Sequence, residues 1–133
     1  MLKALGVPAE QNRDRERGRK EFVMPKYLTI GYGDQIGYDR TTPAVRDAAH
    51  AYDQQLRDRG AIMAIAGSPV QVRNHDRAGV EASKGSFLTA ALPLAGFALI
   101  EAESLEEAIE MVSKTPCAVA QGVVDIWPLE QAK

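Results

Sequence analysis

The chain has 133 residues, enough for one domain in which roughly two-thirds of the unfolded surface is buried. Its hydrophobic fraction of 45% and charged fraction of 26% are ordinary for a globular domain, and no apolar run reaches the roughly 20 residues of a membrane-spanning helix. The net charge of −2 creates no field that would hold a polyanion, so we expect neither a membrane nor a nucleic-acid partner.

Residues 1–25 differ in texture from the rest of the chain. The stretch RDRERGRKE, which begins at Arg13, is almost wholly charged and mixes both signs. We interpret it as a solvated extension that precedes a domain at 26–133. Two alternatives stay open: an arm that holds a partner subunit or an anion, and a true start of the protein at Met24.

The single cysteine, Cys117, excludes an internal disulfide, and the N-terminal sequence shows no apolar segment typical of a signal peptide. We therefore expect a cytoplasmic protein. Cys117 has no histidine or cysteine nearby at the spacing of a metal site or of a nucleophile and its base. We interpret it as a small packed residue.

The first predicted strand is KYLTIGY, at 26–32, because its residues alternate with the two-residue period of a strand. Apolar side chains occur on both of its faces. After the loop GDQIGYDR, Thr42 and Pro43 stand where the N-cap and the first residue of a helix belong. Apolar residues then recur on one helical face, and Gly60 ends the run. The members of this face are Val45, Ala48, Ala49, Tyr52 and Leu56.

The middle of the chain predicts a buried strand followed by a hairpin. The short apolar run AIMAIAG at 61–67 suits the strand, and PVQVRNHDRAGVEAS predicts a hairpin that turns at 74–77. Val70 and Val72 alternate with polar residues, so we expect one face of the hairpin to be wet.

Two strands and a helix complete the pattern. GFALIEAE predicts a strand at 96–101 that is apolar on both faces. Ser104 is expected to cap the next helix, and Glu107, three residues later, to complete a capping box. The last strand is expected at 123–127 and to be stopped by Pro128. The buried side of the helix is expected to consist of Leu105, Ala108, Ile109 and Val112.

This order of elements predicts an α+β fold, a ferredoxin-like βαββαβ sandwich with an inserted hairpin. Two helices can cover only one face of such a sheet. Because the strands at 26–32, 96–101 and 123–127 are apolar on both faces, the second face needs another cover. A second copy of the chain is the simplest one, so we expect a homodimer in which the two sheets meet face to face.

The segment SKGSFLTAALPLAGFALIEAESLEEAIEMV resembles the YCII-related family, including its DGPF-like branch. At the corresponding places the family has TDGPF, a loop ending in Leu-Gly-Gly-Phe, and Ile-Glu-Ala-Asp-Ser-Leu-Asp-Glu-Ala. KYLTIGYGD and GVVDIWPL resemble the family's opening and closing strands, so the resemblance covers about Lys26 to Leu129. It implies a ferredoxin-like unit that dimerises into an α+β barrel, with a pocket near the barrel and the first helix.

The resemblance also has implications for activity. Some family members look like cofactor-independent lyases, isomerases or dehalogenases built around a His and Asp pair, and others are associated with sigma factors. The family's Asp after the second helix falls at Thr115 here, and its first-helix His aligns near Ala49, one residue from His50. Lys84 and Ser86 stand where the DGPF branch has Asp and Pro.

His50 is the candidate general base, because an imidazole titrates near neutral pH, and Asp53 at i+3 is the residue to orient it. Such a pair is also common on a solvated helix face. Measured from Val45, His50 sits about 140° from the centre of the apolar face, so we expect it to point away from the sheet. His50 and His75 are the only histidines, and we expect no metal and no cofactor.

Further candidates for ligand binding lie on the strands. Asp125 and Trp127 are expected to project to the same side of the last strand, and Asp125 matches a Glu of the family. A carboxylate on the dimer face needs a partner, so Asp125 is either a member of an ion pair between subunits or a pocket group. Tyr27, Thr29 and Tyr32 either line the same cavity or belong to the core.

The corner KGSF admits two interpretations. In the first it is a turn, in which Gly85 supplies a backbone conformation that other residues resist and Phe87 is an anchor. In the second it lines the pocket, with Ser86 as a ligand-binding group.

Two functions are consistent with these observations. The preferred one is a dimeric small-molecule-binding or regulatory module, because the carboxylate of the family is absent at Thr115 while the scaffold is intact. The alternative is a cofactor-independent lyase or isomerase that uses His50 as its base. The two are separated by whether His50 faces the cavity or the solvent.

Overall fold

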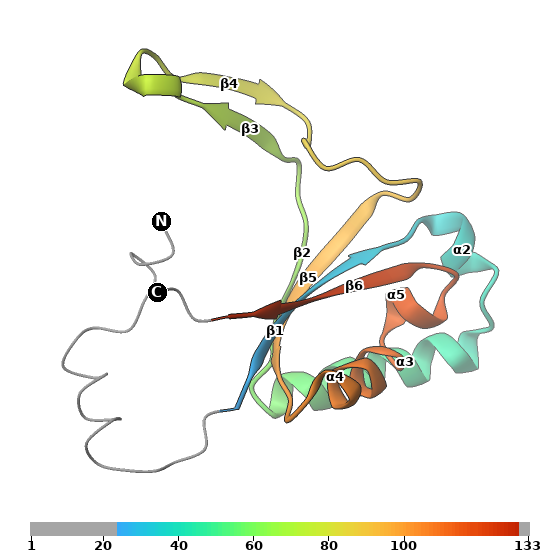
Figure 1. The fold of residues 1–133 in the computed structure, drawn as a ribbon. Helices are drawn as coiled ribbons and strands as arrows, with labels where there is room; N and C mark the ends of the chain where they lie inside the picture. Colours follow the sequence, from blue (N-terminus) through green and yellow to red (C-terminus); the bar gives the residue numbers. More distant parts are fainter. Residues whose placement is uncertain (1–23, 131–133) are drawn as a thin grey trace, which may run out of the picture.

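Three apolar strands that are distant in the sequence form the centre of the fold. In the computed structural model, which describes residues 24–130, β1 (Lys26–Tyr32) lies between β5 (Leu94–Glu101) and β6 (Val123–Leu129) (Figure 1). β2 (Ile62–Ile65) pairs with the other side of β5, so the order is β2-β5-β1-β6 with antiparallel neighbours throughout. The predicted α+β class is confirmed. The charged stretch that begins at Arg13 lies outside the described residues.

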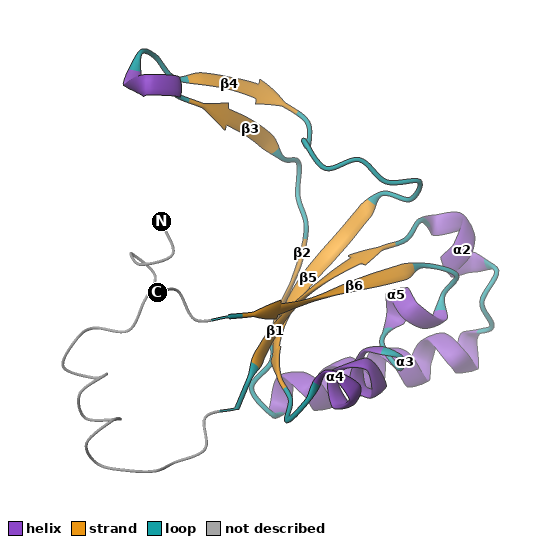
Figure 2. Cartoon of the chain, viewed as in Figure 1, coloured by secondary structure: helices purple, strands orange, loops and turns teal. Residues whose placement is uncertain are grey.

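The helices lie on one face of this sheet, as Figure 2 shows. They are α2 (Gln35–Asp39), α3 (Pro43–Asp58), α4 (Leu105–Val112) and α5 (Pro116–Val119). Two of them, α2 and α5, were not predicted, because segments this short do not show a helical period. Among the described residues no helix is long and apolar enough to cross a membrane.

The core lies between the sheet and the helices. Its buried residues are Tyr27, Ile100, Ala102, Ala108 and Val112. The predicted buried sides of the helices were too wide, since Val45 of α3 and Leu105 and Ile109 of α4 are 45%, 43% and 52% exposed. One sheet face can bury only a narrow stripe of each helix.

Capping side chains define where the helices begin. Ser104 accepts a hydrogen bond from the backbone N–H of Glu107 at 3.1 Å, as predicted. The Glu107 carboxylate accepts in return from the N–H of Glu103, one residue before the position that a capping box requires. Thr42 is the N-cap of α3, followed by Pro43, but its side chain makes no capping hydrogen bond.

The last strand does not stop where the sequence predicted. β6 continues through Pro128 to Leu129, and Pro128 pairs with Tyr27 of β1. β6 is an edge strand, so on its outer side no neighbouring strand needs the N–H group that proline lacks. Proline is therefore tolerated within this strand.

The inserted hairpin forms a separate two-stranded sheet of β3 (Val70–Arg73) and β4 (Glu81–Lys84), joined through η2 (His75–Arg77). The predicted turn at 74–77 is confirmed. We call this hairpin, residues 70–84, the arm. It projects beyond the end of β2, away from the helices (Figure 1), and its principal contacts are within itself.

We call the sheet face opposite the helices the open face; no described helix packs on it, and the contacts of the arm are mainly within itself. Strand register places on the open face a set of mostly apolar side chains, of which Ile62 is 67% and Trp127 is 55% exposed. The prediction that the strands are apolar on both faces is therefore confirmed. The open face consists of Leu28, Ile30 and Tyr32 of β1, Phe97 and Leu99 of β5, Ile62 of β2, and Asp125 and Trp127 of β6.

Candidate functional site

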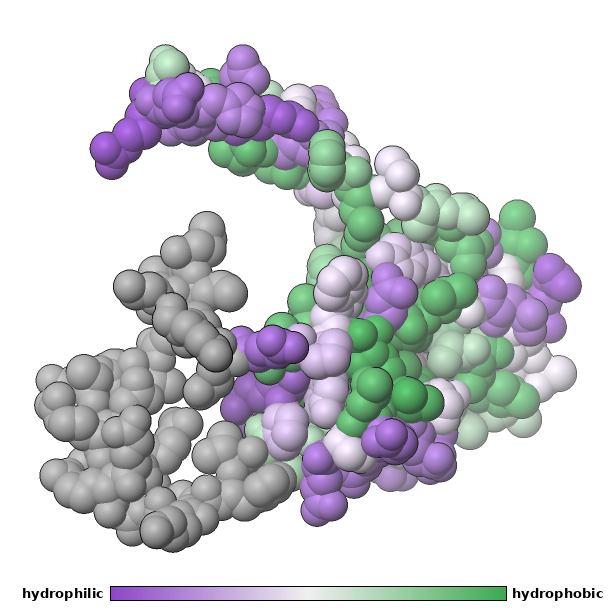
Figure 3. Space-filling view, viewed as in Figure 1, coloured by the Kyte–Doolittle hydropathy of each residue, from purple (hydrophilic) through white to green (hydrophobic). Residues whose placement is uncertain are grey.

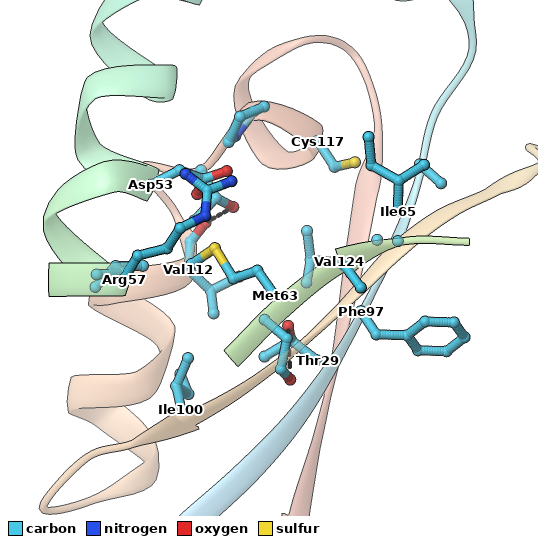
Figure 4. A pocket seen from close by; sticks show the side chains of 18 of the residues that line it. Thr29, Asp53, Arg57, Met63, Ile65, Phe97, Ile100, Val112, Cys117 and Val124 are labelled. Carbon is cyan, nitrogen blue, oxygen red and sulfur yellow. Dashed lines mark hydrogen bonds between the residues drawn. The ribbon is translucent and has the colours of Figure 1, made fainter. Parts of the chain in front are cut away.

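A cavity of about 530 Å³ lies between α3, α5 and the helix-covered face of the sheet (Figure 4). Cavities of this size are typical of sites for small organic molecules. The sheet side is mostly apolar, and polar groups reach the cavity from α3 and from the segment around α5. The polar side chains are Thr29, His50, Asp53, Arg57, Thr115 and Cys117; apolar ones include Met63, Ile65, Ile100, Val112 and Val124.

Asp53 lies on the wall that α3 contributes. It follows the buried Ala49 by about one helical turn, so its carboxyl group borders the cavity and is only partly exposed. Burial raises the pKa of Asp53, while the nearby charges of Arg57 and His50 act in the opposite direction. The ionised carboxyl group accepts hydrogen bonds from a ligand, and only the protonated form can also donate one.

His50 lies at the rim of this cavity. It is rotated about 60° around the helix from Asp53, so its ring borders the cavity while remaining exposed. Its Nε2 atom lies 2.9 Å from the Tyr38 hydroxyl group. His50 was expected to point away from the sheet; it is exposed, but it borders the cavity because the cavity extends past the buried Ala49 and Leu56 to this side of α3.

The segment around α5 closes one end of the cavity. Thr115, at the place where the family has Asp, lines the cavity, and its hydroxyl group donates a hydrogen bond to the Val112 carbonyl oxygen at 2.7 Å. The position therefore faces the cavity, but the carboxylate of the family is replaced by a hydroxyl group whose hydrogen bond is already made within the chain.

Cys117 packs on the sheet next to two glycines. A β-carbon at Gly31 would lie 2.9 Å from the Cys117 Sγ atom, and Gly31 pairs with Gly96 of β5, so two adjacent strands carry no side chain here. Burial raises the pKa of the Cys117 thiol, and the charge of Asp53 raises it further. The thiol stays protonated at neutral pH, which agrees with a packed residue and not with a nucleophile.

The predicted strand residues do not share one cavity. Thr29 lines the cavity, and Tyr27 is buried in the core beneath α4. Tyr32 lies on the open face, where its hydroxyl group donates a hydrogen bond to Asp125 Oδ2 at 3.2 Å, and Trp127 lies on that face as well. Tyr27 therefore belongs to the core, and Thr29 and Tyr32 lie on opposite faces of the sheet, because residues three apart in a strand point to opposite faces.

The KGSF corner joins the arm to the segment before β5. Gly85 has φ of +100°, a conformation that side chains disfavour, and Ser86 Oγ accepts a hydrogen bond from the Leu88 N–H at 3.0 Å. Both features are those of a turn. Ser86 does not border the cavity. Phe87 anchors nothing in the described chain: it is 80% exposed, and its ring faces the Arg73 guanidinium group.

Arg57 and the residues of β2 also line the cavity, although the sequence pattern did not predict them there. Arg57 follows Asp53 by four residues, which places both on the same side of α3, and this spacing was a usable signal. Figure 4 shows Asp53 and Arg57 side by side on the α3 wall, with Met63 beneath them and the Phe97 ring turned away. Within residues 24–130, no three His, Cys, Asp or Glu side chains are grouped so as to hold a metal ion.

The family model of the YCII-related domain matches residues 26–133, so the chain belongs to the YCII-related family. No curated protein matches the sequence significantly.

Substitution Asp53→Asn tests the burial of this carboxyl group. Because the pKa of Asp53 is raised in the folded state, its protonated form contributes to the stability of the fold. This contribution is complete below the ordinary pKa of 3.8 and is lost as the pH rises through the folded-state pKa. The asparagine does not titrate. We therefore expect the stability of Asp53→Asn relative to wild type to increase across that pH range, measured as the free energy of urea unfolding at several pH values.

The matched control is Asp47→Asn, at an exposed position of the same helix. A difference between Asp53→Asn and wild type that stays constant with pH would contradict burial as the cause.

Proposed function

We propose that this YCII-related protein is a dimeric small-molecule-binding module, close to the DGPF-like branch of its family. The observation that carries the proposal is the cavity of about 530 Å³, which is mostly apolar and has a few polar groups that come mainly from α3 and the segment around α5. That combination is the usual composition of a ligand site. With no internal disulfide possible for its one cysteine, we place the protein in the cytoplasm.

The lining defines the kind of ligand. Met63, Ile65 and Val124 offer an apolar surface, whereas Asp53 and Arg57 lie together on the α3 wall. A compact and largely apolar molecule with one polar end fits this arrangement. The polar end would lie against α3, where the Asp53 carboxylate can accept and Arg57 can donate a hydrogen bond.

The open face supports the dimer. The strand order of the sheet, β2-β5-β1-β6, agrees with a ferredoxin-like unit, and two such sheets packed face to face would form the α+β barrel of the family. Ile62, Phe97 and Trp127 are exposed in the single chain. Residues 26–133 would be the dimerising domain, with residues 1–25 as an extension to it.

The dimer is tested with Phe97→Asp. A charge placed in an apolar interface costs several kcal/mol, so we expect the dimer dissociation constant to rise roughly 100-fold or more. Sedimentation velocity measures the dissociation. The sole tryptophan, Trp127, should report the same change as a red shift of its fluorescence.

Ile109→Asp is the matched control, because Ile109 is 52% exposed on α4, on the other side of the sheet. It should leave the dimer intact. A wild-type protein that sediments as a monomer at all concentrations would refute the dimer.

The cavity is tested with Val124→Phe, which directs an aromatic ring into it. We expect the affinity for the apolar probe 1-anilinonaphthalene-8-sulfonate to fall at least about tenfold, because the ring occupies the binding volume. Fluorescence titration measures the affinity. The control Val45→Phe makes the same change at an exposed site on α3; equal binding by both variants would remove the cavity as the site.

One observation favours a second candidate, a cofactor-independent lyase or isomerase. His50 and Asp53 border the cavity together, and the two side chains are close enough for their charges to interact. In this function His50 would be the general base and Asp53 its neighbour on the same wall.

The second candidate is tested by proton NMR on a panel of enolisable carbonyl compounds and lactones. If one of them turns over, we expect His50→Ala to lower the rate about 10²- to 10⁴-fold, as loss of a general base does. His75→Ala removes the other histidine, in the arm, and should have no effect. Equal rates for His50→Ala and wild type would exclude His50 as the base.

A further inference from the structure

The arm has one apolar and one polar face. Strand pairing sets Val70 opposite Lys84 and Val72 opposite Ala82, so these four residues share a face, and the alternate residues form the other. Val70 and Val72 are 63% and 65% exposed. The other described elements therefore leave the apolar face of the arm largely uncovered.

A hairpin of this kind is not stable by itself. Each strand of the arm has four residues, and an isolated two-stranded hairpin is at best marginally stable in water. Figure 3 shows hydrophilic residues on the outer side of the arm and hydrophobic residues on the side turned toward the rest of the domain. The surface that would cover it must enter from that side.

The open face likewise needs a surface that covers it. It is mostly apolar; its charged groups are Asp125 and, at the far end of β1, the pair of Lys26 and Glu101. Asp125 is partly buried and accepts a hydrogen bond from Tyr32, but within residues 24–130 no cation lies within 4 Å of its carboxylate. Lys26 already pairs with Glu101 at 3.4 Å, and the register places it four residues of β6 away from Asp125.

The charges of the two surfaces are complementary. The apolar face of the arm carries one cation, Lys84, and the open face carries one carboxylate without a cation, Asp125. The arm leaves the sheet at the edge formed by β2, whereas Asp125 lies on β6 at the opposite edge, with β5 and β1 between them. A second copy of the chain, packed on the open face, can bring these two groups together.

We propose that the arm of each copy docks its apolar face on the open face of a second copy, with Lys84 beside Asp125 of that copy. The inference rests on the proposed dimer and deepens it, because it assigns the arm and one ion pair to the interface. In a two-fold dimer the contact occurs twice, so each chain gives an arm and receives one. The carboxylate buried by the dimer then has its cation.

The test uses cross-linking between two variants made in a Cys117→Ala background. Lys84→Cys and Asp125→Cys proteins are mixed, dissociated, reassociated and treated with a short bismaleimide. We expect covalent dimers in the mixture at several times the yield from either variant alone. A doubly substituted chain that becomes cross-linked mainly within itself would show that the arm covers its own sheet, and would overturn the inference.

A second measurement separates this inference from the proposed dimer. Lys84→Glu places a like charge beside Asp125 and should raise the dimer dissociation constant roughly 30-fold or more, the effect of disrupting a buried charge pair. The combination Lys84→Glu with Asp125→Lys should restore it. Ser83→Glu, on the polar face of the arm, is the matched control and should leave the constant unchanged.

The outcomes remain distinguishable. A dimer with a blue-shifted Trp127 emission that is insensitive to Lys84→Glu would overturn the role of the arm and leave the sheet-to-sheet dimer standing. A monomer with an exposed Trp127 would refute both. Far-UV circular dichroism of each variant checks that the fold is kept; because Lys84 is exposed, its substitution should not disturb it.

Discussion

A sheet has two faces, and the described helices of this chain cover one of them. The apolar surface on the other side is as regular as the buried one, since both follow from the two-residue period of the same strands. Among residues 24–130 the largest side chains with almost no exposure are Leu56 and Ile100. Much of the apolar content of the sequence therefore lies outside the core. The open face and the arm are two consequences of this imbalance, and one partner surface would resolve both.

Long and strongly periodic elements were predictable. The strand at 26–32 and the helices that begin after Thr42 and Ser104 depend on local patterns and on capping chemistry, and they occur where the sequence placed them. Boundaries were less accurate: whether Pro128 ends a strand depends on which strands are at the edge of the sheet, a property of topology and not of local sequence.

The site was harder to predict, because its position depends on small rotations. Ala49 and Leu56, the buried residues of α3, belong to the predicted apolar face. The cavity is also lined by Asp53 and Arg57, which lie about 80° and 120° around the helix from Val45. The prediction from the hydrophobic pattern counted only apolar side chains as facing the sheet. Likewise Tyr27, Thr29 and Tyr32 were grouped by residue type, although the strand divides them between core, cavity and open face.

The cavity has a floor made of backbone. At Gly96 an added β-carbon would lie 2.6 Å from the carbonyl oxygen of Ala64, which is main chain and cannot give way, and at Gly31 it would meet Cys117. The sheet side of the site is therefore closed to enlargement of its side chains at these two points. Ligand selectivity would therefore vary through the other lining side chains, such as those of α3, β2 and the α5 segment, while the base of the site stays constant at these two points.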